Sequence, residues 1–237
     1  GVCHTDLHAI MGDWPVKPKE HLIPGHEGVG TVVAVGPGVE GVEVGDILGN
    51  AWLANACGVC EFCRTGRETL CEAQKNSGYS VDGCYAEYKI VEPKFAASIP
   101  EGVDLNEIAP ILCAGVTAYK GLKQTEVKPG HWVVISGVGG LGHIAVQYAI
   151  AMGMRVAAVD IDDAKLALAA EHGAELTVNA KTQDAVAVIQ EEIGGSHGVL
   201  VTAVNPIAFS QAMRMTRRGG TIALVGLPPG TFEVDIF

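Results

Sequence analysis

The amino-acid sequence predicts an α/β protein with two domains, a β-rich domain followed by a doubly wound parallel sheet of the Rossmann type. The first half has short β-rich stretches separated by Gly, Pro and Asp, and the second half alternates apolar runs with segments of helical spacing. Such alternation is typical of a parallel sheet with helices on both faces. We place the domains at residues 1–115 and 116–237.

In the second domain, strands and helices are expected in alternation. The five strands are expected at 131–137, 155–160, 176–180, 198–204 and 221–227. The helices are expected at 139–154, 162–174, 182–194 and 206–217. A complete dinucleotide-binding fold commonly has six strands. We therefore expect the C-terminal end of this domain to be missing.

The first domain gives two strand predictions. Residues 28–36 and residues 84–92 combine β-branched or aromatic side chains with turn residues at their borders. The chain opens on Gly1 rather than Met, so we expect the N-terminus of this domain to be missing too, together with any targeting segment.

Composition excludes several classes of function. A net charge of −11 argues against a nucleic-acid surface, which needs clustered Lys and Arg. No apolar run reaches the roughly 20 residues that cross a bilayer. Seven cysteines, four of them crowded together, favour metal binding over a disulfide framework, and with it a reducing, cytoplasmic compartment.

A glycine-rich loop lies between the first expected strand and helix of the second domain. GVGGLG contributes Gly137, Gly139, Gly140, Leu141 and Gly142. In such a loop the first glycine allows a tight turn, the second lets the backbone approach a pyrophosphate and the last lets helix and strand pack closely. The following helix directs its N-terminal amides at that phosphate.

The acidic residue expected after such a loop is Asp160, 18 residues beyond Gly142. A carboxylate here binds the adenosine ribose and repels a 2′-phosphate, so it favours NAD over NADP. The alternative is a helix-capping aspartate. Lys165 can also reach the ribose, or it can be an ordinary solvated lysine.

The cysteine-rich segment CGVCEFCRTGRETLC has the spacing C-x2-C-x2-C-x7-C. Its cysteines are Cys57, Cys60, Cys63 and Cys71. Four thiolates can close a tetrahedral shell around Zn²⁺, and a closed shell makes the zinc structural. An iron–sulfur cluster uses the same ligands and stays an alternative.

Three further candidate ligands are Cys3, His26 and Cys113. Two cysteines and one histidine would leave one tetrahedral corner open, as in catalytic zinc sites. Taken singly, each is as easily a buried core residue. Their wide separation in the sequence makes spacing uninformative.

Taken together, the motifs resemble those of zinc-dependent medium-chain alcohol dehydrogenases, in particular the bacterial ethanol-active type. The motifs that carry the resemblance are GVCHTDLH, PGHEGVG, the four-cysteine segment, CAGVTAY and GVGGLG, in this order. The resemblance runs along the whole chain and implies a GroES-like catalytic domain before the Rossmann domain. It also implies a homodimer or homotetramer for the full-length parent.

The resemblance implies roles for single residues. Cys3, His26 and Cys113 would hold a catalytic zinc and the four-cysteine segment a structural zinc, two per chain. Asp6 would orient His26, and Glu27 would lie near the metal. Thr5 and His8 would form a proton relay, and His4 would lie near the pyrophosphate. The nicotinamide would be surrounded by Thr117, Val204, Val225 and Leu227, and the pocket would be narrowed by Trp14 and Trp52. Plain core packing is the alternative for both tryptophans.

The implied reaction is the reversible NAD-dependent oxidation of small primary alcohols to aldehydes, with an alkoxide bound to the catalytic zinc and hydride transfer to NAD. The alternatives are a polyol or aryl-alcohol dehydrogenase of the same family and a non-catalytic zinc- and nucleotide-binding fragment. Two positions depart from the family pattern: Ile47 replaces an arginine, and Cys84 replaces a glycine whose turn it would strain if φ there is positive.

Overall fold

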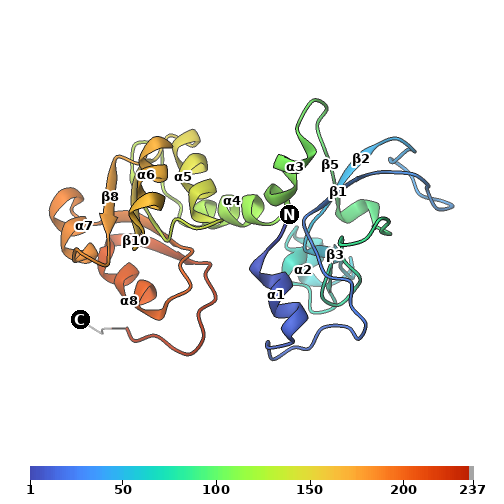
Figure 1. Ribbon diagram of the computed structural model, residues 1–237, viewed down its shortest axis with the longest axis horizontal. Coiled ribbons are helices and arrows are strands. Elements are labelled where there is room, and N and C mark those ends of the chain that lie inside the picture. Colours follow the sequence, from blue (N-terminus) through green and yellow to red (C-terminus); the bar gives the residue numbers. More distant parts are fainter. Residues whose placement is uncertain (235–237) are drawn as a thin grey trace. The chain divides into compact units, whose positions relative to one another are not determined.

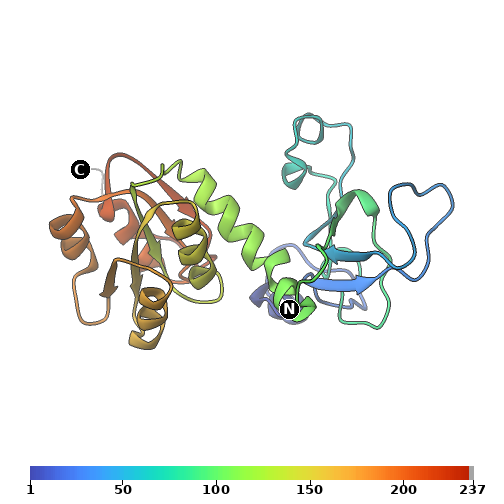
Figure 2. The ribbon, with the colours of Figure 1, turned by 90° about the horizontal axis from the view of Figure 1, so that it is seen from above.

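The computed structural model of the chain describes residues 1–234, which divide into two compact units (Figures 1 and 2). The first unit runs from Gly1 to Cys113, and the second begins at Ala114. The boundary predicted from the sequence lies two residues later.

The second unit is built on a five-stranded parallel sheet with the strand order β10-β9-β6-β7-β8. Its strands are β6 (Trp132–Ser136), β7 (Arg155–Asp160), β8 (Leu176–Asn179), β9 (Ser196–Val201) and β10 (Thr216–Leu224). Its helices are α4 (Ala114–Gln124), α5 (Gly142–Ala151), α6 (Asp163–Glu171), α7 (Ala185–Ile193) and α8 (Pro206–Met215). The predicted α/β class is confirmed.

Helices cover both faces of this sheet. In Figures 1 and 2, α4, α5 and α6 lie on one face and α7 and α8 on the other, in agreement with their contacts. Val133, Val134 and Ile135 of β6 are therefore fully buried. Burial on both faces explains why the sheet strands read as continuous apolar runs.

The direction in which successive strands are added to the sheet changes at β6. From β6 the chain moves outward to β7 and β8, and it then returns to the other side of β6 to form β9 and β10. Ligands of open α/β sheets bind at the carboxyl ends of the strands that flank such a reversal. The glycine loop at 137–142 follows β6 directly, so it lies at this point.

The first unit contains two small antiparallel sheets. One has the order β1-β2-β5, and the other pairs β3 with β4. The elements are α1 (His4–Met11), β1 (Gly28–Thr31), β2 (Ile47–Asn50), β3 (Leu53–Asn55), α2 (Glu61–Arg64), β4 (Lys75–Asn76), β5 (Ala96–Ser98) and α3 (Leu105–Ile108). Most of this unit is loop, and the loops hold the chemistry-bearing residues.

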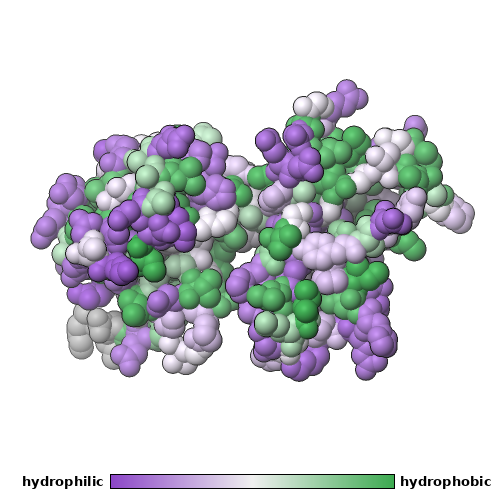
Figure 3. Space-filling view, viewed as in Figure 1, coloured by the Kyte–Doolittle hydropathy of each residue, from purple (hydrophilic) through white to green (hydrophobic). Residues whose placement is uncertain are grey.

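Helix α1 has an unusual orientation for a surface helix. Its buried residues are Asp6 and Ala9, whereas Ile10 and Met11 are each 66% exposed. Figure 3 shows the resulting apolar surface over α1. Because a surface helix normally buries its apolar side, a polar contact must determine which face of α1 points inward.

No helix among residues 1–234 is long and apolar enough to span a membrane.

Both strand predictions for the first unit need correction. Only 28–31 of the predicted strand 28–36 pairs as β1, and 84–92 forms no strand. Alternation alone cannot make a strand, because a strand needs a neighbour to complete its hydrogen bonds. No strand among the described residues pairs with 84–92. Instead, an apolar hollow of ≈ 620 Å³ lies between 31–36 and 87–91.

The two residues that depart from the family pattern, Ile47 and Cys84, both fit the structure without a positive φ. Ile47 begins β2. Cys84 has no positive φ, so the strain considered for a cysteine at this turn does not arise. Its sulfur lies against Gly28, where an added Cβ would come within 2.4 Å of it. The amide of Asn50 donates to the same sulfur at 3.2 Å.

We expect two glycines of the same loop to respond oppositely to alanine. A Cβ at Gly142 would lie 1.9 Å from the carbonyl oxygen of Gly137, whereas a Cβ at Gly140 meets nothing within 4 Å. Gly142→Ala should lower the free energy of unfolding by about 1–3 kcal/mol through overpacking. Gly140→Ala is the matched control and should leave it unchanged. Denaturant unfolding measures both, and equal stability of the two variants would contradict the close helix–strand contact.

Candidate active site

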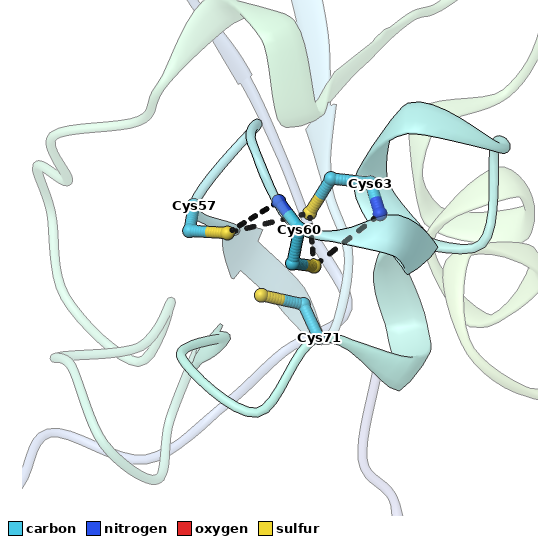
Figure 4. A group of neighbouring side chains, drawn as sticks. All are labelled: Cys57, Cys60, Cys63 and Cys71. Atoms are coloured by element: carbon cyan, nitrogen blue, oxygen red, sulfur yellow. Dashed lines mark hydrogen bonds between the residues drawn. The ribbon is translucent and has the colours of Figure 1, made fainter.

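The four cysteines of 57–71 form a compact cluster (Figure 4). Cys60 is the N-cap of α2, Cys63 lies within that helix, and Cys71 follows a short 3-10 turn. The sulfur of Cys63 lies 3.9 Å from that of Cys57 and 3.5 Å from that of Cys60. All four sulfurs lie within 4.8 Å of one another. The cluster therefore assembles from one continuous loop.

This geometry fits a single tetrahedral metal ion. Zn–S bonds of about 2.3 Å place the sulfurs of a tetrahedral shell about 3.8 Å apart, close to the spacing seen here. The spacing is too short to hold a cluster of iron and sulfide atoms between the four thiolates. The backbone N–H groups of Val59 and Cys60 lower the pKa of Cys57 to about 6, whereas desolvation raises the pKa of Cys63 to about 12, so Cys57 is the member of the cluster that most readily forms a thiolate.

A second group brings together Cys3, His26 and Cys113, which the sequence separates widely. Cys3 is the N-cap of α1, His26 precedes β1, and Cys113 precedes α4. Nε2 of His26 lies 3.2 Å from Sγ of Cys113, and the sulfurs of Cys113 and Cys3 lie 3.9 Å apart. A tetrahedral zinc needs about 3.6 and 3.8 Å for these pairs. The three residues therefore fit a zinc ion and leave its fourth corner open.

The carboxylate of Asp6 holds this group in place. Asp6 is only 3% exposed. Nδ1–H of His26 donates to its Oδ1 at 2.9 Å, which turns Nε2 toward the cysteines. The backbone N–H of Gly25 donates to the same oxygen at 3.1 Å, and that of Cys3 donates to Oδ2 at 2.9 Å. One buried carboxylate thus orients two of the three ligands.

Tyr85 is a fourth donor to Asp6 that the sequence analysis missed. Its hydroxyl donates to Oδ2 of Asp6 at 2.9 Å. Its ring lies against Gly25, where a Cβ would come within 2.6 Å of the ring, and Gly25 has a φ of 97°. Gly25 is therefore needed both for the backbone turn and for the close approach of the ring. The signal in the sequence was the aromatic residue of GCYAEY, which we had interpreted only as part of a strand.

The ligand group also alters the acidity of its members. The hydrogen bond with Cys113, together with smaller contributions from His26 and Thr5, lowers the pKa of Cys3 to about 3 against the opposing effect of burial. Burial acts to lower the pKa of His26, but the contact with Cys3 and the charge of Asp6 outweigh it and raise the pKa. The site therefore favours a thiolate, the form of cysteine that binds metal.

The remaining predicted residues of this unit lie around the ligands. Thr5 hydrogen-bonds to Cys3 through its backbone and its hydroxyl. Glu27 is buried next to His26 in the chain. The rings of His4 and His8 lie 5.0 Å apart, and Nδ1 of His8 lies 2.9 Å from a carboxylate oxygen of Asp13.

Both predicted pocket tryptophans belong to a row of rings that ends at a ligand. Trp14 stacks on His8 at 4.9 Å, and Trp52 meets His26 edge-on at 5.3 Å. Tyr79, which the sequence analysis missed, lies 5.6 Å from Trp14 and 5.7 Å from Trp52. Trp52 therefore lies directly beside the ligand group, and Trp14 is connected to it through Tyr79.

In the second unit, Asp160 lies against the glycine loop. The backbone N–H of Val138 donates to its Oδ2 at 2.6 Å, and the N–H groups of Ile161 and Asp162 donate to Oδ1. Nζ of Lys165 lies 4.0 Å from Oδ1. The glycine loop, through Val138, and this carboxylate are thus neighbours, as a dinucleotide site requires.

The loop glycines differ in their surroundings. Gly137 has a φ of 94°, and Gly142 packs against its carbonyl oxygen. Gly139 and Gly140 face open space, which suits the approach of a phosphate. Leu141 is the N-cap of α5.

The residues predicted around the nicotinamide lie at or beyond the carboxyl ends of the strands, with one on α4. Val204 is 65% and Leu227 66% exposed, and both follow the strand ends of β9 and β10. The N–H of Val225 donates to the carbonyl of Val201. Thr117 lies on α4, half buried. These positions agree with the edge at which open sheets bind ligands.

We expect substitutions at Asp6 to release the metal of the three-ligand group selectively. Asp6→Asn removes the charge that orients His26, and loss of such a partner typically costs 10- to 100-fold in metal affinity. Tyr85→Phe, which removes one donor from Asp6, should have a smaller effect in the same direction. Competition with a chelator, followed by mass spectrometry, measures the zinc retained.

Asp13→Asn is the matched control, because Asp13 is an exposed carboxylate on the same segment. The four-cysteine cluster serves as an internal control, since it has no contact with Asp6 among the hydrogen bonds of the described residues. Equal zinc retention by Asp6→Asn and Asp13→Asn would contradict the role of Asp6.

Comparison with known proteins identifies the family to which this chain belongs. Residues 1–101 match the alcohol dehydrogenase GroES-like domain, and residues 140–237 match the zinc-binding dehydrogenase domain. An alcohol dehydrogenase of Moraxella sp. (strain TAE123) is 65% identical over 237 residues, which are 100% of this chain and 70% of the relative. One from Geobacillus stearothermophilus is 58% identical with the same coverage.

Solved structures agree with the sequence relatives. The alcohol dehydrogenase TADH from Thermus sp. ATN1 has a TM-score of 0.90 and 30% identity, covering 100% of this chain and 70% of that one. A protein described as a zinc-binding dehydrogenase from Sinorhizobium meliloti 1021, bound to NADP, has a TM-score of 0.90 and 31% identity with the same coverage. The chain therefore belongs to the zinc-dependent medium-chain alcohol dehydrogenases, a family of oxidoreductases.

Proposed function

We propose that this chain carries out the reversible NAD-dependent oxidation of small primary alcohols to aldehydes. The observation that carries the proposal is the convergence of Cys3, His26 and Cys113 on one point with an open fourth position. When bound there, zinc would supply a Lewis acid that lowers the pKa of an alcohol, and NAD would supply the hydride acceptor.

The residues around the ligands would handle the proton. The hydroxyl of Thr5, held beside Cys3, would accept it from the alcohol. His8 is half buried and pairs with Asp13, so it would release the proton to solvent. His4, next to His8, would lie near the pyrophosphate, and Glu27 would approach the ligand group during ligand exchange.

The cofactor residues favour NAD. The carboxylate of Asp160 accepts three backbone N–H groups, so its charge is held at the edge of the glycine loop. There it would bind the ribose hydroxyls and repel a 2′-phosphate. Gly137, Gly139, Gly140, Leu141 and Gly142 would hold the pyrophosphate, with Lys165 near the ribose. Thr117, Val204, Val225 and Leu227 would surround the nicotinamide.

Three further inferences complete the proposal. We infer two zinc ions per chain, since both cysteine-containing groups fit a tetrahedral ion. We infer a cytoplasmic location, because none of the seven cysteines forms a disulfide, as in a reducing compartment. A homodimer or homotetramer of the full-length parent is inferred from the family resemblance alone.

We expect the zinc-loaded chain to oxidise ethanol with NAD⁺, measured as NADH absorbance. Cys113→Ser should reduce kcat/KM by about 100-fold or more, because it removes a ligand rather than an orienting partner. Cys84→Ser is the matched control, since Cys84 belongs to neither group. A chain that holds two zinc ions yet turns over no alcohol would be a non-catalytic zinc- and nucleotide-binding fragment. Faster turnover of polyols or aryl alcohols would instead indicate those family branches.

We expect Asp160→Asn to reduce the preference for NAD⁺ over NADP⁺ by about tenfold or more. The variant keeps one oxygen that can accept the N–H of Val138 but loses the charge that repels a 2′-phosphate. The ratio of kcat/KM for the two cofactors measures the preference. Wild-type chain that prefers NADP⁺, or an unchanged ratio in the variant, would contradict the assignment of Asp160.

A further inference from the structure

Tyr79 connects the two tryptophans, Trp14 and Trp52, that the family resemblance implies at the alcohol pocket. Its ring lies between them, with centroid distances of 5.6 Å to Trp14 and 5.7 Å to Trp52. It is only 4% exposed. No direct contact between the rings of Trp14 and Trp52 occurs among the aromatic pairs of the described residues. Their separation is therefore determined by the ring that lies between them.

The loop that carries Tyr79 is also fixed to the segment that carries Trp14. The hydroxyl of Tyr79 donates to the carbonyl of Val16, and its own carbonyl accepts from the backbone N–H of Lys19 at 2.8 Å. Burial and the nearby charge of Asp13 raise the pKa of Tyr79, so the hydroxyl keeps its proton and stays a donor. The segment that carries Trp14 is thus bound to Tyr79 at two points, through Val16 at the hydroxyl of Tyr79 and through Lys19 at its backbone carbonyl.

The same loop is fixed to the segment that carries Trp52. The backbone N–H of Ser77 donates to the carbonyl of Trp52 at 2.8 Å, and the amide of Asn50 donates to the hydroxyl of Ser77 at 2.9 Å. Trp52 in turn meets the ring of the ligand His26. Displacing Tyr79 would therefore move both tryptophans without touching the ligand residues themselves.

We propose that Tyr79 is a positioning residue that sets the chain length of the alcohols this chain accepts. The proposal rests on the proposed function and on the family resemblance, which implies that Trp14 and Trp52 are walls of the alcohol pocket. A smaller side chain at 79 would let both rings relax into the vacated volume and lengthen the pocket. Substrate discrimination of this kind is worth about 10- to 200-fold per methylene group.

The test compares Tyr79→Leu, Tyr79→Phe and the wild type in the full zinc-loaded chain. We expect Tyr79→Leu to raise the ratio of kcat/KM for 1-butanol over ethanol by tenfold or more. Tyr79→Phe keeps the ring between the tryptophans and should stay within about threefold of the wild type. Tyr88→Leu is the matched control, because Tyr88 belongs to the same unit but is 75% exposed. General loss of structure would lower both rates and leave the ratio unchanged.

A binding measurement separates this inference from the proposed function. Butyramide and acetamide are unreactive analogues of aldehydes, and calorimetry in the presence of NADH gives their relative affinities without turnover. If the wild type oxidises no alcohol, the proposed function fails, and a tenfold shift toward butyramide in Tyr79→Leu still supports the inference. An unchanged ratio in an active enzyme overturns the inference alone. A wild type that binds neither amide overturns it as well, since no pocket then exists for Tyr79 to shape.

Discussion

The first unit depends on the hydrogen bonds made by one buried carboxylate. Asp6 accepts from Cys3, Gly25, His26 and Tyr85, which belong to three segments far apart in the sequence. A buried charge is tolerated only when it is paired and hydrogen-bonded, and each such bond contributes about 1.5–3 kcal/mol. These bonds explain why α1 turns a carboxylate inward and apolar residues outward, and why two metal ligands meet although nothing in the sequence brings them together.

In the second unit, the carboxylate of Asp160 is held by backbone N–H donors, with the ammonium of Lys165 4.0 Å away. Its two oxygens accept from Val138, Ile161 and Asp162, all of them close to the sheet edge at which β6 and β7 end. A carboxylate oxygen can accept two hydrogen bonds. Oδ1 therefore accepts two N–H groups of its own turn, whereas Oδ2 accepts one from the described residues and keeps an acceptor position that would serve a ribose hydroxyl under the proposed function. The loop thus fixes the carboxylate and still leaves it able to bind.

Local patterns carried most of what could be predicted from the sequence. Strands β6, β7, β8 and β9 contain buried apolar runs, which located them, whereas β10 has no buried residue and the strand predicted at 221–227 overlaps only its second part. The four cysteines lie within one loop, so spacing located their cluster. The segment 84–92 has the alternation of a strand but no neighbour to pair with. Tyr79 and Tyr85 escaped prediction because their partners, Trp14 and Asp6, lie more than sixty residues away, and no spacing rule reaches that far.

Under the proposed function, metal binding and the selection of the alcohol depend on different residues of the first unit. Asp6 orients the predicted ligand His26 through a hydrogen bond, whereas among the ring pairs of the described residues the aromatic row meets that ligand through the edge of Trp52. An edge-to-face ring contact contributes about 0.5–1.5 kcal/mol, less than the several hydrogen bonds that hold the buried carboxylate. Changes among Trp14, Tyr79 and Trp52 can therefore reshape the pocket while the ligand geometry persists. Under the proposed function, such a division would let one metal-binding frame accept different alcohols through substitutions confined to the rings.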